Sequence, residues 1–337
     1  MPMFSWAKPK PIHILQRIDP DQIIYIISDL HLGDGTRSDA FMAKDNDLLR
    51  FIERVRNENA HLIIAGDAID FHQAWSMSRV LRAHSKLLGS LSRLADTHGV
   101  TYIWGNHDYD ISLFKDVLRF DVCSDLEIGD SVLVRHGYEY DTFIGPNLEA
   151  SHITTRIHHL AERLLNSWIR LPLRDFYNVE TRVAFWLFHK YAIAIHLAHK
   201  ALSAVGFSNV LDKQRDIIQY WSMNQMGDAG CMYEGIRSAL HERKYQWIVT
   251  GHSHLPGKIE VLPGSYYVNT GSWTFNSTQY ARWDGDSFEV RDWVTNRLYD
   301  DRVYQPLHNR RHHHMNFLSW WRENYLGHFR YRRDSLP

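Results

Sequence analysis

Five short apolar runs along this chain of 337 residues are each followed, within two residues, by a polar motif. Short apolar runs rich in β-branched residues predict buried strands. Ligands of open α/β sheets bind beyond the carboxyl ends of the strands, so we expect the five motifs to meet at one edge. The runs are 23–28, 61–65, 100–104, 131–134 and 245–249, and the motifs are Asp29-Leu30-His31, Gly66-Asp67, Gly105-Asn106-His107-Asp108, His136-Gly137 and Gly251-His252-Ser253-His254.

Helical spacing separates the first three runs. Residues 47–57 and 77–96 carry leucines and other apolar residues three and four positions apart, which predicts amphipathic helices. Strands that alternate with helices predict an α/β layered fold. After the last motif the pattern changes to strands at 258–261 and 266–269 and a hairpin over 279–293, which turns at Asp284-Gly285-Asp286.

The bulk composition excludes several classes of protein. The net charge is −1 and the pI is about 7.1, so the overall charge favours neither nucleic acid nor an acidic partner. Cys123 and Cys231 are too few for a disulfide framework or a cysteine-based zinc site, which makes a reducing, cytoplasmic location the expectation. The first 16 residues contain no apolar core of a signal peptide.

The motifs together supply the ligand types of a dinuclear metal site. Taken singly, an Asp-x-His motif is equally well explained by a capping Asp beside a core His. Taken together, carboxylate, imidazole and amide groups are sufficient for two divalent cations that share one carboxylate. Such a site produces hydroxide at neutral pH and holds a phosphoryl group. These ligands suit Mn, Fe or Zn, and Mn is our first choice.

The ordered set resembles the calcineurin-like metallophosphoesterases over residues 23–141 and 245–293. The resemblance implies a four-layer α/β/β/α sandwich, with a core formed by 20–141 and 245–300. It also implies in-line attack on phosphorus at two metals. By this resemblance Asp29, His31, Asp67 and His254 hold one metal, and Asp67 bridges to a second metal that is held with Asn106, His136 and His252.

Two catalytic residues and two weaker substrate contacts are expected near the metals. His107 is the candidate general acid for the leaving oxygen, with Asp108 orienting its ring. A purely structural role for His107 behind the metal ligands is the alternative. Arg37 and Arg135 lie near the motifs and are weak candidates for binding a phosphate in a bidentate manner.

Further matches are similar to the UDP-2,3-diacylglucosamine pyrophosphatase branch of that family. They are 27–33, His136-Gly137-x-Glu139-x-Asp141 and 268–273. That branch cleaves a pyrophosphate in lipid A synthesis and carries a helical insertion over the acyl chains. This chain departs from it at His107, where the best-known members have Arg, and in a longer insertion. A related phospholipid therefore stays open as the substrate.

Two segments lie outside the expected core. Residues 142–244 predict a large helical insertion, strongest over 149–168 and 179–204, which either is buried as a cap or presents an apolar face to lipid. The tail 301–337 is basic and aromatic, and 310–337 has the composition of an interfacial helix on anionic lipid. Packing back on the domain and binding of single-stranded nucleic acid are the alternatives for the tail.

The leading hypothesis is a dinuclear hydrolase of a phosphoester or pyrophosphate in a lipid-linked substrate, peripheral on the inner membrane face. One alternative is a soluble phosphodiesterase or phosphatase acting on nucleotides or proteins. Another is a catalytically silent scaffold that binds protein partners. The expected partners are the phosphorylated small molecule, an anionic membrane, and a second copy of the chain through the insertion.

Overall fold

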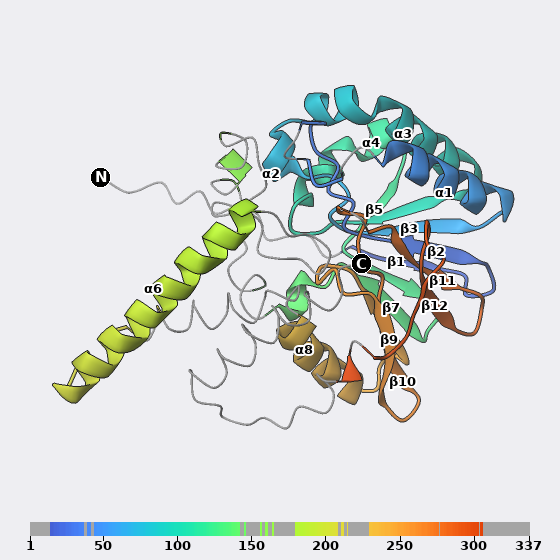
Figure 1. The fold of residues 1–337 in the computed structure, drawn as a ribbon. Helices are drawn as coiled ribbons and strands as arrows, with labels where there is room; N and C mark the ends of the chain where they lie inside the picture. Colours follow the sequence, from blue (N-terminus) through green and yellow to red (C-terminus); the bar gives the residue numbers. More distant parts are fainter. Residues whose placement is uncertain are drawn as a thin grey trace, which may run out of the picture.

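The strands expected from the apolar runs form two β-sheets in the computed structural model (Figure 1). The structure describes residues 14–36, 39–41, 44–141, 179–207, 229–275 and 277–302, with the separate residues 145, 156, 159, 160, 164, 210, 211, 214, 304 and 305. Arg37, the tail 310–337 and most of the segment 142–178 lie outside the described residues.

The first sheet has seven strands in the order β13-β12-β11-β2-β3-β4-β5. Four neighbouring strands run parallel, so the three motifs that follow β2, β3 and β4 emerge side by side. The antiparallel strands β11 and β12 form the expected hairpin. The bounds are β2 Ile24–Ile27, β3 His61–Ala65, β4 Val100–Ile103, β5 Asp121–Cys123, β11 Gln279–Trp283, β12 Phe288–Asp292 and β13 Leu298–Tyr299.

The second sheet has six strands in the order β1-β6-β7-β8-β10-β9. Its strands β7 and β8 are parallel neighbours, which places the last two motifs beside each other. Strands β1, β5, β6 and β13 have no counterpart among the expected strands. The bounds are β1 Leu15–Ile18, β6 Asp125–Ile128, β7 Val132–Arg135, β8 Trp247–Thr250, β9 Gly257–Leu262 and β10 Ser265–Asn269.

Alternation along the strands builds the layers. In β2, Ile24 and Ile26 face the core between the two sheets, whereas Tyr25 and Ile27 face the helices. The helices α1 (Asp45–Asn57) and α3 (Met77–His98) cover the outer face of the seven-stranded sheet, as Figure 1 shows. Helix α8 (Ala229–His241) covers the outer face of the other sheet. The expected four-layer α/β/β/α fold is confirmed. Four short helices, α2 (Phe71–Ala74), η1 (Tyr109–Phe114), α4 (Lys115–Leu118) and η2 (Tyr138–Tyr140), complete the described connections.

Helix α6 (Val179–Ala204) stands apart from the sheets at the left of Figure 1. It leaves large apolar side chains exposed, at 55% for Leu187, 47% for Tyr191 and 59% for Leu197. No helix in the described part of the chain is long and apolar enough to cross a bilayer. The division of the chain into a core, an insertion over 142–244 and a tail stays a prediction.

Candidate metal centre

The five motifs meet where the strand ends of the two sheets come together. One group consists of Asp29, His31 and His254, and another consists of Asp67, His136 and His252. Within each group the nearest possible ligand atoms lie within 4.8 Å of one another. The side-chain oxygen of Asn106 lies 3.2 Å from His136 Nε2, so the structure brings all seven candidate ligands together.

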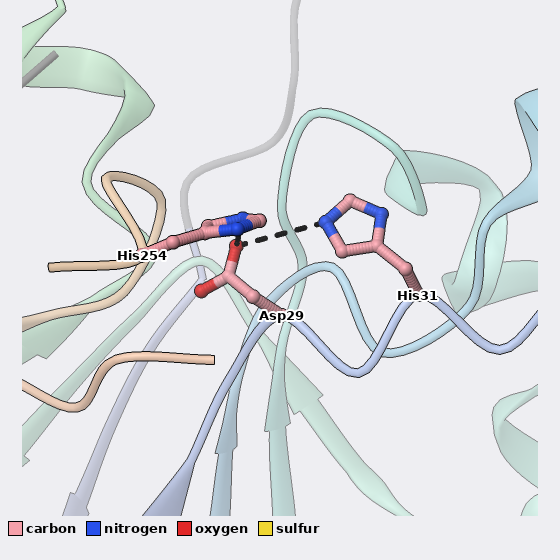
Figure 2. Close-up of side chains that lie close together, drawn as sticks. All are labelled: Asp29, His31 and His254. Carbon is pink, nitrogen blue, oxygen red and sulfur yellow. Dashed lines mark ion pairs between the residues drawn. The ribbon is translucent and has the colours of Figure 1, made fainter. Parts of the chain in front are cut away.

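Asp29 lies between the imidazole rings of His31 and His254, as Figure 2 shows. Its Oδ1 is 3.1 Å from His254 Nε2 and 3.9 Å from His31 Nε2. Its Oδ2 accepts hydrogen bonds from the Ser28 hydroxyl at 2.5 Å and the His252 amide at 2.9 Å. Oδ1 of Asp29 and Nε2 of His31 are buried without a hydrogen-bond partner among the described residues. A carboxylate oxygen and an imidazole nitrogen in this state fit a cation between them.

The Asp67 carboxylate faces both groups. Its Oδ2 lies 3.3 Å from His136 Nε2 and 3.9 Å from His31 Nε2. Its Oδ1 accepts a hydrogen bond from the His107 amide at 2.8 Å, which holds the carboxylate in this orientation. One oxygen that faces an imidazole of each group has the placement that a shared ligand requires.

The ring of His136 is oriented for ligation. Its Nδ1 donates to the Ala65 carbonyl at 2.8 Å, and because a carbonyl only accepts, Nε2 is left to face Asp67. Burial lowers the pKa of His136, but the carboxylates of Asp67 and Asp29 outweigh burial and raise it to about 10. The buried carboxylates thus favour positive charge at this point, which a proton or a cation supplies.

The backbone at the strand ends adopts a conformation that side chains disfavour. A left-handed φ is uncommon outside glycine because it costs a residue with a side chain about 1–3 kcal/mol. It persists only where the surrounding structure enforces it. Such outliers cluster at functional sites. The five candidate ligands with this conformation are Asp29 (φ 53°), His31 (48°), Asp67 (52°), His252 (62°) and His254 (54°).

Gly105 and Gly251 are two of the motif glycines that close approach requires. A Cβ at Gly105 would lie 2.1 Å from Asp67 Oδ1. A Cβ at Gly251 would lie 2.3 Å from Asp29 Oδ2 and 2.3 Å from Ser28 Oγ. A side chain at either position would displace a candidate ligand, so the glycines belong to the site even though they ligate nothing.

The turn after β10 supports the last motif. The Asn269 amide donates to the Gly251 carbonyl at 2.7 Å and to the Ser253 hydroxyl at 3.0 Å. The hydroxyls of Thr270 and Ser28 lie 2.6 Å apart, next to Asp29. The 268–273 match therefore has a structural account, since it fixes the loop that carries His252 and His254.

The structure differs from the expectation that Asp108 orients His107. The Asp108 carboxylate accepts hydrogen bonds from the amides of Gly105 at 2.6 Å and Ala68 at 2.7 Å and from the Tyr102 hydroxyl. These bonds hold the motif loop against its neighbour. The carboxylate that reaches the His107 ring is Asp70, whose Oδ1 lies 3.1 Å from Nδ1.

Arg135 is occupied by a carboxylate. Its guanidinium pairs with Asp125 Oδ1 at 2.5 Å and lies over the Tyr140 ring at 5.4 Å. A phosphate would have to compete with Asp125 for it, which weakens the expected role. Arg37, the other weak candidate, lies outside the described residues.

Sequence reasoning assigned no role to three further residues at the centre. Asp70 had a local signal, because Asp-x-x-Gln is a helix-start pattern and its carboxylate accepts from the Gln73 amide at 3.0 Å. Asp141 lies in the fourth motif's extension, and its Oδ2 is 3.2 Å from His252 Nε2. His159 is buried with Nε2 3.4 Å from Asp70 Oδ2, and nothing in the sequence singled it out.

The sequence model of the calcineurin-like phosphoesterases matches residues 23–256, a range that spans all five motifs. The chain belongs to this family. It is therefore a metal-dependent phosphoester hydrolase, and the family implies two divalent metal ions at the site. The comparison with curated proteins gives no match.

Three solved structures are similar to this chain at low sequence identity. A dimetal phosphatase from Danio rerio is 16% identical, covers 81% of this chain and 96% of its own, and has a TM-score of 0.39. A cold-active protein-tyrosine phosphatase from a Shewanella species is 13% identical over 83% and 81%, with a TM-score of 0.37. A predicted phosphoesterase from Streptococcus pneumoniae TIGR4 is 12% identical over 82% and 92%, with a TM-score of 0.32.

Proposed function

We propose that the chain hydrolyses a phosphoester or pyrophosphate bond in a lipid-linked substrate, such as UDP-2,3-diacylglucosamine or a related phospholipid. The observation that supports this reaction is the position of the Asp67 carboxylate. Its Oδ2 lies 3.3 Å from Nε2 of His136 in one group and 3.9 Å from Nε2 of His31 in the other. In this proposal Asp29, His31, Asp67 and His254 hold one metal, and Asp67, Asn106, His136 and His252 hold the other.

The residues around the proposed metal positions have different roles in the reaction. When bound, two divalent ions lower the pKa of water and neutralise the charge of the phosphoryl group. Asp70 accepts from Nδ1 of His107, so Nε2 is the atom that delivers a proton to the leaving oxygen. The amide of His107 holds Asp67 at the same time, which ties the acid to the metal centre.

Manganese is the metal we propose. The donor set mixes imidazole, carboxylate and amide oxygen, a combination that suits Mn, Fe and Zn better than the all-oxygen shells of Mg or Ca. Metal analysis of the chain purified without added metal tests this choice, together with activity after reconstitution with each metal. Highest activity with Zn or Fe would overturn the assignment of Mn.

Helix α6 supports a lipid-linked substrate. Leu187, Tyr191 and Leu197 are exposed large apolar side chains on a helix that stands clear of the sheets. Exposed apolar groups of this kind are suited to acyl chains. The matches with the UDP-2,3-diacylglucosamine pyrophosphatase branch point to the same substrate class.

The substrate proposal is tested by a comparison of acylated and unacylated substrates. We expect the Mn-loaded chain to release UMP from UDP-2,3-diacylglucosamine in detergent at least about 10-fold faster than from UDP-glucose, since a missing apolar contact alone changes rates by about 10-fold or more. Equal rates would overturn the lipid preference in favour of a soluble nucleotide hydrolase. His107→Ala serves as the control for background hydrolysis.

We also propose that residues 310–337 bind the anionic inner face of a membrane, because Arg and aromatic residues alternate there. The full chain is expected to float with anionic vesicles, and deletion of Arg310 to Pro337 is expected to abolish flotation. Equal flotation of both forms would contradict a role for the tail and direct attention to α6.

A further inference from the structure

A carboxylate surrounded by histidine rings lies beside the metal centre. Asp70 is buried, and atoms of His31, His107 and His159 lie 3.1 to 3.4 Å from its two oxygens. The ring of His107 contacts the ring of His31 at 4.7 Å between centroids and that of His72 at 4.8 Å. The cluster connects a candidate metal ligand, the proposed acid and a residue from the segment that follows η2.

Of the three histidines within 3.4 Å of the Asp70 oxygens, His159 is the one that the motifs do not supply. Its exposed fraction is 2%, although its chain neighbour Leu160 is 40% exposed. Its ring stands edge-on to His107 at 6.3 Å between centroids. His159 lies far along the chain from His107, yet it brings a buried imidazole next to the buried Asp70 carboxylate at the centre.

The two oxygens of Asp70 have separate partners. Oδ1 lies 3.1 Å from His107 Nδ1 and accepts from the Gln73 amide at 3.0 Å. Oδ2 lies 3.3 Å from His31 Nδ1 and 3.4 Å from His159 Nε2. Rotation of the carboxylate would take Oδ1 away from His107, and the two imidazoles at Oδ2 oppose that rotation.

We infer that His159 is a positioning residue for the proposed acid His107 and acts on it through Asp70. The inference rests on the proposed function, since it gives the His107 proton a role in departure of the leaving group. His159 does not itself contact the reacting atoms. By holding Oδ2, it keeps Oδ1 on Nδ1 of His107 and so keeps Nε2 aimed at the leaving oxygen.

Removal of His159 should affect substrates according to their leaving group. Bis(p-nitrophenyl) phosphate releases p-nitrophenolate, which departs without a proton, whereas diphenyl phosphate releases a phenol that needs one. We expect His159→Leu, which fills the volume but cannot pair with the Asp70 carboxylate, to lower kcat on diphenyl phosphate about 10-fold. The same variant should change kcat on bis(p-nitrophenyl) phosphate less than about 2-fold.

Two further variants separate positioning from packing. His159→Gln keeps an N–H donor near the place of Nε2 and should recover most of the diphenyl phosphate activity. His159→Asn is polar but too short to reach Asp70 and should behave like His159→Leu. Leu160→Ala changes an exposed neighbour and should match the unmodified chain on both substrates. Unchanged metal content in every variant shows that the centre itself is intact.

The outcomes that overturn the inference are distinct from failure of the proposed function. Equal loss on both substrates would make His159 a structural residue, and no loss on either would remove its role. His107→Gln is measured on the same substrates. If His107→Gln shows the leaving-group effect and both His159→Leu and His159→Asn lack it, the inference about His159 is wrong and the acid stands. If His107→Gln lacks the effect as well, the proposed acid falls and the inference falls with it.

Discussion

The strand ends and helix α6 both depart from the usual distribution, in which apolar side chains are buried and polar ones face water. They depart from it in opposite ways. At the strand ends Asp29, Asp67 and His136 are buried, although charged and polar side chains ordinarily face water. Along α6, Leu187 and Leu197 are exposed, although leucine is ordinarily buried. The comparison teaches that a residue in the wrong environment marks a site, and that its chemistry indicates which partner it lacks.

A third region shows how buried polar groups behave when the chain satisfies them by itself. His84 in α3 is buried, with Nδ1 2.8 Å from Asp45 Oδ1 and Nε2 3.3 Å from Asp39 Oδ2. Each of its ring nitrogens has a carboxylate partner. At the strand ends, by contrast, Oδ1 of Asp29 and Nε2 of His31 have no hydrogen-bond partner among the described residues, as expected where a cation completes the site.

The largest effect should come from the carboxylate that the two metal positions share. Asp67→Asn keeps the size of the side chain but removes its charge, so we expect loss of both metals and a fall in activity of at least about 10³-fold, or about 4 kcal/mol. Elemental analysis and the phosphodiester assay check this. The exposed Asp130→Asn is the matched control, and two metals retained in Asp67→Asn would refute the shared ligand.

The buried carboxylate of Asp108 should matter for stability and not for proton delivery. Asp108→Ala leaves the buried amides of Gly105 and Ala68 without their acceptor, so we expect the free energy of unfolding in urea to fall by about 3 kcal/mol. The ratio of activities on diphenyl and bis(p-nitrophenyl) phosphate should stay unchanged. A changed ratio would restore Asp108 as the group that orients His107.

His84 should give the self-satisfied region a pH dependence. Burial lowers the pKa of His84, but Asp39 and Asp45 outweigh burial and raise it from 6.5 to about 9. Since the folded pKa lies above the unfolded one, the stabilisation is complete below pH 6.5 and is lost as the pH rises through about 9. The stability advantage over His84→Gln should shrink by about 2 kcal/mol across this range in urea titrations. A constant difference would contradict the pairing.

The smallest effect on stability is expected on α6. Leu187→Ser should change the free energy of unfolding by less than about 0.5 kcal/mol because the side chain is exposed. Leu91→Ala, at a buried leucine of α3, is the comparison and should lose about 2–5 kcal/mol. Binding of Leu187→Ser to anionic vesicles should weaken if α6 meets lipid. A large loss of stability would show that Leu187 is packed against the domain.

The parts of the fold with strong local patterns could be predicted from the sequence. The expected strand 61–65 is β3, and the expected helices 47–57 and 77–96 lie within α1 and α3. The short edge strand β1 (Leu15–Ile18) was not predicted because none of its residues is fully buried and a tertiary partner determines its pairing. The partition of the strands between two sheets depends on pairings that no local pattern encodes.

The residues of the site also divide into those that local sequence patterns predict and those that depend on tertiary contacts. The seven candidate ligands were recognisable because each follows a strand, and the geometry brings them together. Asp70 was readable as a helix cap but not as the partner of His107, because the contact depends on how two loops meet. His159 could not be predicted, because the chain has 22 histidines and no motif around residue 159 distinguishes it from the others.

The pairing of Asp29 with His254 has a consequence for synthesis of the chain. The two residues lie 3.1 Å apart in space but 225 positions apart in sequence. At ordinary rates of translation, Asp29 leaves the ribosome about 10 to 45 s before His254 does. During this time the nascent chain contains the first ligands of the centre but lacks its last imidazoles. No ribosome-bound fragment that ends before residue 254 can contain a complete site.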